Sequence, residues 1–375
     1  MLKSAAIYPE IIDNTYIYKV ADYVKRIKRY GFNEVFTTIH LPEYSLKEQI
    51  EALKIIACET KGANLELTVD IGGHFIKDIL NNDEIINVLS NLKIDYIRLD
   101  YGFNDDDAKN LYNSIKFKGY VVNASIYDPK EAKQVIEMLK NIDSKIQIRA
   151  CHNYYILENT GIDPIHSIKQ DTIFKKMNIP VYYCVPSYSS PRQPLKKGLC
   201  TIENHRFKSL DYILSDLLLN YEINAFMLAD EWLSDEELEI VDMTLKKINV
   251  KLHDIEDIEI EFYEGTSNVE KEIVLSDHVF RYDSPFDLLR SVTSRQMAEM
   301  ARSIDPNNIY DMHLGDIIIV NRLNKRYSGE LQVNLRNRKK EDGSNVVARV
   351  KKQEDLVKLW RYKEKITYCF KECQG

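Results

Sequence analysis

Apolar and polar residues alternate in eight short segments within the first two-thirds of the chain, and segments with helically spaced apolar residues separate them. Alternation with a period of two is typical of β-strands, and an apolar spacing of three to four residues is typical of amphipathic helices. The predicted strands are residues 5–10, 34–40, 65–71, 96–102, 120–126, 146–152, 181–187 and 225–231. Eight strand-helix units in about 250 residues match the count and length of a TIM barrel.

Several predicted helices have recognisable ends. One predicted helix ends before Gly31. Another begins at Ser45, which has the spacing of a capping box with Glu48. A third begins at Asp128, which is followed by Pro129 at the first helical position. A doubly wound open sheet also alternates strand and helix, but it usually has about five to seven strands. The eight predicted strands therefore favour the closed barrel.

The pattern changes near residue 250, where strand-like segments with Gly and Asn turns begin to dominate. These segments are residues 258–265, 270–281, 315–337 and 345–352. The charged segment 336–345 predicts an exposed hairpin loop. We therefore predict an α/β TIM barrel over residues 1–250 and a smaller, mainly β domain over residues 253–375.

Composition narrows the class of protein. The chain has 375 residues, 44% of them hydrophobic, and a formal net charge of −7, which disfavours a general nucleic-acid binder. Lys3 and Glu10 interrupt the first apolar segment, and no window is long and apolar enough to span a membrane. We therefore expect a cytoplasmic protein with no nucleic-acid or membrane partner. The six cysteines have no regular spacing, so we expect reduced thiols.

Every predicted strand closes on ionisable or amide side chains, and the active site of a TIM barrel lies at the carboxyl ends of its strands. The candidate catalytic carboxylates are Asp70, Asp100, Glu203 and Asp230. The candidate substrate-binding residues of the barrel are Arg98, Asn123, His152, Asn153, Tyr155 and Arg206. Several carboxylates around one pocket suit glycoside cleavage, which needs a proton donor and a second group at the anomeric carbon.

Alternative roles remain open for some of these residues. Asp230 suits a helix cap or a turn as well as catalysis, and Arg98 suits a pair with a neighbouring carboxylate as well as substrate binding. Cys151 is expected to pack and not to react. The strand ends show no paired histidine spacing, so we expect no metal and no cofactor. No lysine closes a strand, which disfavours Schiff-base chemistry.

Several longer motifs resemble one family over nearly the whole chain. They are "YIRLDYGF" (96–103), "VVNAS" (121–125), "CHNYY…TGI" (151–162), "GLCTIENHR" (198–206), "LLRSVTSR" (288–295), "GDIIIVN" (315–321) and "RYSGELQV" (326–333). In this order they resemble the bacterial 6-phospho-N-acetylmuramidases. The resemblance implies a TIM barrel followed by a cyclophilin-like domain. It also implies an exo-acting cytoplasmic glycosidase that removes N-acetylmuramic acid 6-phosphate from N-acetylglucosamine during recycling of cell-wall sugars.

The implied substrate, a small phosphorylated amino-sugar disaccharide, carries a phosphate and a lactyl carboxylate, which arginine binds well. We therefore expect an anion clamp at Arg290 and Arg295, or at Arg206 in the barrel, although an interdomain salt bridge would use the same residues. The sequence leaves open which carboxylate is the acid, whether the 2-acetamido group attacks the anomeric carbon, and the oligomeric state. Two other functions also stay open, a non-catalytic sugar-phosphate sensor and a phosphosugar isomerase or aldolase.

Overall fold

The computed structural model forms two compact units. The first is Met1–Leu214 with Ile223–Asp242, and the second is Ser215–Glu222 with Met243–Gly375. The structure describes residues 1–10, 12–13, 15–100, 102–246, 255–285, 287–296, 304–352, 355–356, 359–360 and 367–372. The domain boundary predicted at residues 250–253 lies outside the described residues, and it stays a prediction.

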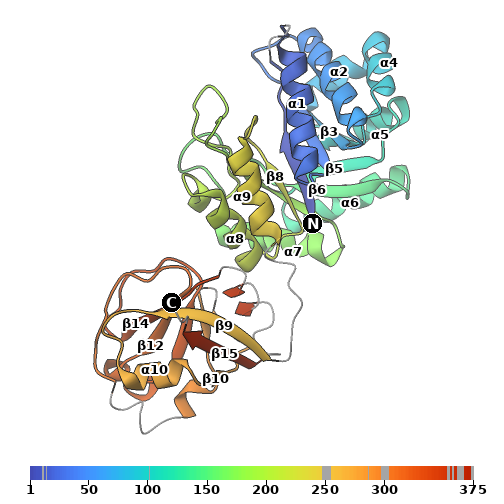
Figure 1. Ribbon diagram of the computed structural model, residues 1–375. Coiled ribbons are helices and arrows are strands. Elements are labelled where there is room, and N and C mark those ends of the chain that lie inside the picture. The colour runs from blue at the N-terminus through green and yellow to red at the C-terminus, as the bar shows by residue number, and fades with distance from the viewer. Residues whose placement is uncertain are drawn as a thin grey trace. The chain divides into compact units, whose positions relative to one another are not determined.

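The strands of the first unit are all parallel and close into a barrel in sequence order. They are β1 (Leu2–Ala6), β2 (Glu34–Thr38), β3 (Glu66–Ile71), β4 (Tyr96–Leu99), β5 (Gly119–Asn123), β6 (Gln147–Cys151), β7 (Val181–Val185) and β8 (Ala225–Leu228). Figure 1 labels β3, β5, β6 and β8 among them. The barrel closes where β1 pairs with β8, with Leu2 opposite Ala225. The closed barrel is confirmed and the open sheet is excluded. The first strand ends earlier than predicted, so Tyr8 and Glu10 follow it in a loop.

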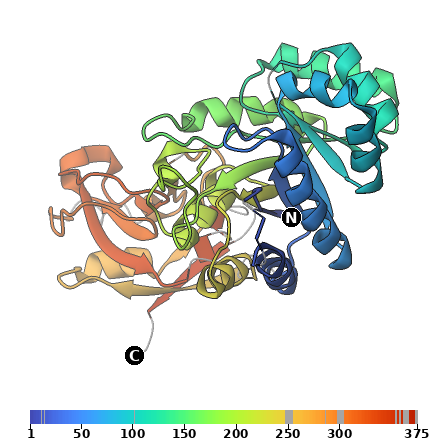
Figure 2. The same cartoon turned by 90° about the horizontal axis from the view of Figure 1, so that it is seen from above.

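Helices follow the strands and lie outside them (Figure 2). They are α1 (Tyr16–Arg29), α2 (Leu46–Gly62), α3 (Gly73–Leu80), α4 (Asp83–Asn91), α5 (Asp105–Ser114), α6 (Pro129–Ile142), α7 (Pro164–Lys176), α8 (Leu210–Asn220) and α9 (Asp235–Lys246). The predicted capping box of Ser45 and Glu48 is confirmed, as is the cap of Asp128 before Pro129. These local signals explain where α2 and α6 begin.

The amino end of the barrel interior holds a buried charged cluster. The guanidinium of Arg149 bonds to Glu34 and donates to Glu66 Oε2 at 2.6 Å, and the hydroxyl of Tyr182 donates to Glu34 at 3.0 Å. Towards the carboxyl ends of the strands lies an apolar layer that includes Phe36, Val121, Cys151, Cys184 and Met227. Cys151 therefore packs in this layer, as expected. The layer forms the floor beneath the polar mouth of the barrel.

The second unit is mainly β, as predicted, with strands in the order β10-β15-β9-β14-β12-β13-β11. Its elements are β9 (Ile255–Phe262), α10 (Asn268–Val274), β10 (Asp277–His278), β11 (Leu288–Arg290), β12 (Asp316–Val320), β13 (Leu331–Asn334), β14 (Ser344–Val350) and β15 (Thr367–Glu372). Neighbouring strands are antiparallel except for β9 and β15, which run parallel. Ile273 and Val274 of α10 pack into its apolar core.

Two predictions for the second unit are wrong. Residues 270–281 were expected to be strand-like, but most of the first half is helix α10, which begins at a capping box formed by Ser267 and Glu270. The predicted strand began inside this box and so missed its signal. Residues 336–345 do not close a hairpin, because β13 and β14 both pair with β12 and not with each other. The exposure predicted for this segment is confirmed at Lys339 and Lys340.

Candidate active site

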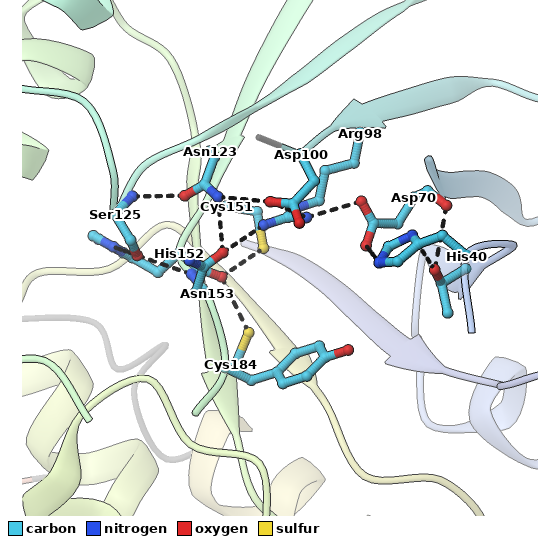
Figure 3. A network of polar contacts seen from close by, with 12 residues as sticks. His40, Asp70, Arg98, Asp100, Asn123, Ser125, Cys151, His152, Asn153 and Cys184 are labelled. Carbon is cyan, nitrogen blue, oxygen red and sulfur yellow. Dashed lines mark hydrogen bonds and ion pairs between the residues drawn. The ribbon is translucent and has the colours of Figure 1, made fainter. Parts of the chain in front are cut away.

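A cavity of about 220 Å³ opens at the carboxyl ends of the barrel strands. We call it the central pocket, and it is lined by Phe36, His40, Asp70, Arg98, Asp100, Cys151, His152, Asn153, Tyr154 and Met227. Side chains two residues apart on a strand share a face, so polar residues that end the inward faces of neighbouring strands converge here. The structure thus brings together six of the residues predicted from strand ends, Asp70, Arg98, Asp100, Asn123, His152 and Asn153 (Figure 3).

Arg98 lies between the two carboxylates of this pocket (Figure 3). Its Nη1 donates to Asp70 Oδ1 at 2.8 Å and lies 3.4 Å from Asp100 Oδ1, and its Nη2 donates to Asn153 Oδ1 at 2.7 Å. The pair with Asp70 follows from the sheet register, which places these two residues opposite each other. Burial lowers the pKa of Arg98, but the charges of Asp70 and Asp100 outweigh burial and raise it. Arg98 is therefore a permanent cation beside Asp100.

The two carboxylates differ in their access to the pocket. The side chain of Asp70 is only 4% exposed and is held by Arg98, with His40 Nε2 at 3.8 Å from its Oδ2. The side chain of Asp100 is 35% exposed, and its Oδ1 accepts a hydrogen bond from Asn123 Nδ2 at 3.1 Å. Asp100 is therefore the carboxylate that a molecule in the pocket can reach, whereas Asp70 mainly orients Arg98.

His152 lines the pocket, but both of its ring nitrogens already have partners. Nδ1 lies 3.0 Å from Ser125 Oγ, and Nε2 lies 2.9 Å from Asp171 Oδ1. Ser125 Oγ in turn accepts a hydrogen bond from the backbone N–H of Asn153 at 2.9 Å. Asn153 also accepts from Asn123 Nδ2 at 2.8 Å. His152 therefore positions the amides, and its predicted direct contact with substrate stays a prediction.

Asp230 holds a loop in place. Its oxygens accept hydrogen bonds from the backbone N–H groups of Ser187, Arg192 and Leu199 at 3.0, 2.8 and 2.9 Å. Burial raises the pKa of Asp230, and these three hydrogen bonds oppose the increase. The residue does not cap α9, where the Ser234 hydroxyl instead accepts from the N–H of Glu237. Asp230 thus fixes the loop after β7, with neither oxygen free of a hydrogen bond.

Glu203 and Arg206 brace neighbouring loops in a similar way. Glu203 accepts hydrogen bonds from the backbone of Asn159 and Gly161, both at 2.8 Å, and from Arg206 Nε at 2.8 Å. Arg206 also donates to the carbonyl of Tyr155 at 3.0 Å. The hydrogen bonds from Arg206, more than any other cause, lower the pKa of Glu203 to about 2. A carboxyl group with this pKa is a poor proton donor at neutral pH.

Replacing Glu203 with Gln is expected to lower the free energy of unfolding by on the order of 2 kcal/mol at pH 7. The kcat for the phosphorylated disaccharide that the sequence resemblance implies is expected to stay nearly unchanged. The pKa of Glu203 is lower in the folded state, about 2, than in the unfolded chain. Its contribution to stability is therefore present above the unfolded pKa, near 4, and lost as the pH falls towards 2. Urea unfolding of the wild type and of the Glu203→Gln variant between pH 7 and pH 3 measures this difference in stability and its dependence on pH. A large loss of kcat with unchanged stability would instead place Glu203 in catalysis.

The remaining predicted ligands lie outside the residues that line the central pocket. Tyr155 pairs with Cys200 through its backbone, at 3.0 Å. Arg290, in the second unit, donates to both oxygens of Glu330 at 2.7 and 2.8 Å, and Arg295 Nε lies 3.7 Å from the same carboxylate. The anion clamp expected at Arg290 and Arg295 stays a prediction.

A second cavity, of about 550 Å³, contains residues that the sequence did not single out. We call it the side pocket, and it is lined by Tyr8, Pro9, Glu10, Asp13, Leu41, Glu43, Tyr44, Arg192, Gln193, Pro194 and Glu231. Glu10 and Glu231 close the first and last predicted strands, as His40 closes the second. The position of Glu10 and Glu231 at predicted strand ends was the available signal that they belong to a site, but the sequence gives no measure of their burial.

The described part of the chain offers no group of three or more His, Cys, Asp or Glu side chains that could hold a metal ion. Among the same residues, no helix has both the length and the apolar character that a membrane span requires.

Comparisons with known proteins agree with this architecture. The family model described as the N-terminal part of 6-phospho-N-acetylmuramidase matches residues 5–243, and the model of its C-terminal part matches residues 257–365. No curated protein matches the chain.

Two solved structures share the fold along almost the entire chain. One is an uncharacterized B. cereus protein, with 23% identity, a TM-score of 0.59 and 99% of each chain covered. The other is a conserved protein of unknown function from Enterococcus faecalis, with 23% identity, a TM-score of 0.55, and 100% of this chain and 97% of that chain covered. The two family models together span most of the sequence. The chain therefore belongs to the 6-phospho-N-acetylmuramidase family and is a glycosidase.

Proposed function

We propose that this glycosidase is an exo-acting hydrolase that removes N-acetylmuramic acid 6-phosphate from the N-acetylglucosamine of a phosphorylated disaccharide. The observation that carries the proposal is the central pocket, where the accessible carboxylate of Asp100 lies beside the buried cation of Arg98. The family name supports a phosphorylated muramyl sugar as the substrate class. The pocket matches the need of glycoside cleavage for a carboxylate near the anomeric carbon.

In this proposal Asp100 acts at the anomeric carbon, as a base, as a nucleophile or by orienting the 2-acetamido group of the substrate. Asp70 and Arg98 hold Asp100 and the neighbouring amides in place. Asn123 and Asn153 present amide groups next to Asp100, where sugar hydroxyls bind. Glu203 and Asp230 support loops, because hydrogen bonds already occupy their oxygens.

We also infer that the enzyme works in the cytoplasm, in recycling of cell-wall sugars, on a disaccharide that a phosphotransferase transporter phosphorylates on entry. The second unit is inferred to be cyclophilin-like, which its seven-stranded sheet and apolar core support. An aldolase that forms a Schiff base would need a lysine at the reacting carbon. Among the described residues, neither pocket lining includes one.

The test is incubation of the purified protein with the phosphorylated disaccharide, its unphosphorylated form and a longer phosphorylated chain blocked at its non-reducing end. The expected result is release of N-acetylglucosamine from the phosphorylated disaccharide, with or without a chelator, and no cleavage of the blocked chain. Binding of the phosphorylated disaccharide without any release would overturn the proposal and would favour a sensor. Cleavage of the blocked chain would overturn exo-action.

A further inference from the structure

The carboxyl group of Glu231 lies in the side pocket with one oxygen anchored. Its Oε2 accepts a hydrogen bond from the backbone N–H of Tyr8 at 3.1 Å, which ties the loop after β8 to the loop after β1. Within the described part of the chain, this is the only hydrogen bond that the carboxyl group accepts. The group is therefore oriented by the backbone while its other oxygen remains available to the cavity that it lines.

Burial and the charge of Glu10 favour the protonated form of Glu231. Glu10 also lines the side pocket, where its Oε1 accepts hydrogen bonds from Lys19 Nζ at 3.0 Å and from Trp232 Nε1 at 2.8 Å. Burial first, and then the charge of Glu10, raise the pKa of Glu231 to about 7, against the opposing effects of the Tyr8 N–H, Arg192 and Lys19. The other titratable groups that line the side pocket are Tyr8, Asp13, Glu43 and Tyr44. A carboxylic acid that keeps its proton near neutral pH suits general acid catalysis.

The side pocket adjoins the central pocket. Arg192, which lines the side pocket, donates from Nη1 to the hydroxyl of Tyr154, which lines the central pocket, at 3.3 Å. Phe36, which lines the central pocket, and Leu41, which lines the side pocket, belong to the same buried apolar cluster. A glycosidic bond at the junction would therefore have Asp100 in the pocket of one sugar and Glu231 in the pocket of the other.

We propose that Glu231 is the general acid of this glycosidase and that the side pocket holds the sugar that leaves. The inference rests on the proposed function and assigns the proton donor that it lacks. The Glu231 carboxyl gives its proton to the glycosidic oxygen as the bond from that oxygen to the anomeric carbon breaks, and the bonding pair stays on the oxygen. Water then supplies the oxygen that bonds to the anomeric carbon. The proton that water loses passes to Glu231, or to Asp100 if Asp100 is the base, and in the second case exchange with solvent returns a proton to Glu231.

The test compares two substrates that differ only in the leaving group. For Glu231→Gln, kcat on the phosphorylated disaccharide is expected to fall about 10²- to 10⁴-fold. On the 4-nitrophenyl glycoside of N-acetylmuramic acid 6-phosphate, whose leaving group needs no proton, kcat is expected to stay within about threefold of wild type. The matched control is Glu137→Gln, an exposed position on α6, which is expected to change neither rate.

The pH profile gives a readout that a merely structural role would not move. Because the active form of Glu231 carries the proton, the activity of the wild type on the disaccharide is expected to fall as the pH rises through about 7. This fall is the basic limb of the pH profile. Glu10→Gln removes a charge that raises the pKa of Glu231, so this limb is expected to shift to lower pH.

The outcomes separate the inference from the proposed function. Equal losses on the two substrates for Glu231→Gln, or full activity of this variant on the disaccharide that the wild type cleaves, would overturn the role of Glu231 and leave the proposed function standing. A wild-type protein that cleaves neither substrate would overturn both.

Discussion

Replacing Asp100 with Asn is expected to lower kcat on the phosphorylated disaccharide by about 10²- to 10⁴-fold, the range that a positioned acid or base contributes. Asp100 is the accessible carboxylate of the central pocket, and an amide of the same shape can neither accept a proton nor form a glycosyl ester. Its hydrogen bond with Asn123 and its contact with Arg98 mark where the side chain must stay. Initial rates at saturating substrate measure the effect.

The matched control for this substitution is Asp78→Asn, an exposed position on α3, which is expected to keep wild-type kcat. Circular dichroism and thermal unfolding of both variants separate a lost reaction from a lost fold. Wild-type turnover by Asp100→Asn would remove Asp100 from the chemistry.

Replacing Arg98 with Met is expected to lower the free energy of unfolding by about 3–5 kcal/mol, because it leaves a buried charge without its partner. Asp70 is the residue affected, since its side chain is 4% exposed and Arg98 is its hydrogen-bonding cation at 2.8 Å. Arg98 also holds Asn153, so the same variant is expected to lose activity. Urea unfolding at pH 7 measures the stability.

The double variant Arg98→Met, Asp70→Asn serves to identify the cause. It is expected to recover much of the lost stability, because the amide of Asn leaves no unpaired charge in the interior. Arg29→Met, at an exposed position on α1, is the matched control and is expected to cost little. A double variant as unstable as Arg98→Met alone would contradict the account of the Asp70 pair.

Much of the barrel could be predicted because its signals are local. Strand alternation has a period of two, and helix starts such as Ser45 with Glu48 are encoded within four residues. The errors arose where the predicted segment began partway through a local signal, or where the outcome depends on strand pairing between residues far apart in the sequence. The segment 270–281 began inside a capping box, and the segment 336–345 connects two strands that both pair with β12.

The candidate site shows the same division. Asp70, Arg98 and Asn123 converge because parallel strands end together at one face, which is a rule of the fold. The occupied oxygens of Asp230 and Glu203 could not be predicted, because they depend on the conformation of long loops. Glu231 was missed for a related reason, since burial and a neighbouring carboxylate raise its pKa and neither is visible in one sequence.

The most direct test of the central claim is the ratio of kcat/KM for the phosphorylated disaccharide to kcat/KM for its unphosphorylated form, measured with one preparation of the wild-type protein. A phosphomuramyl glycosidase is expected to favour the phosphorylated form by at least about 10- to 100-fold, the worth of one or more hydrogen bonds to a charged group. A ratio near one, or no hydrolysis of either form, would contradict the account.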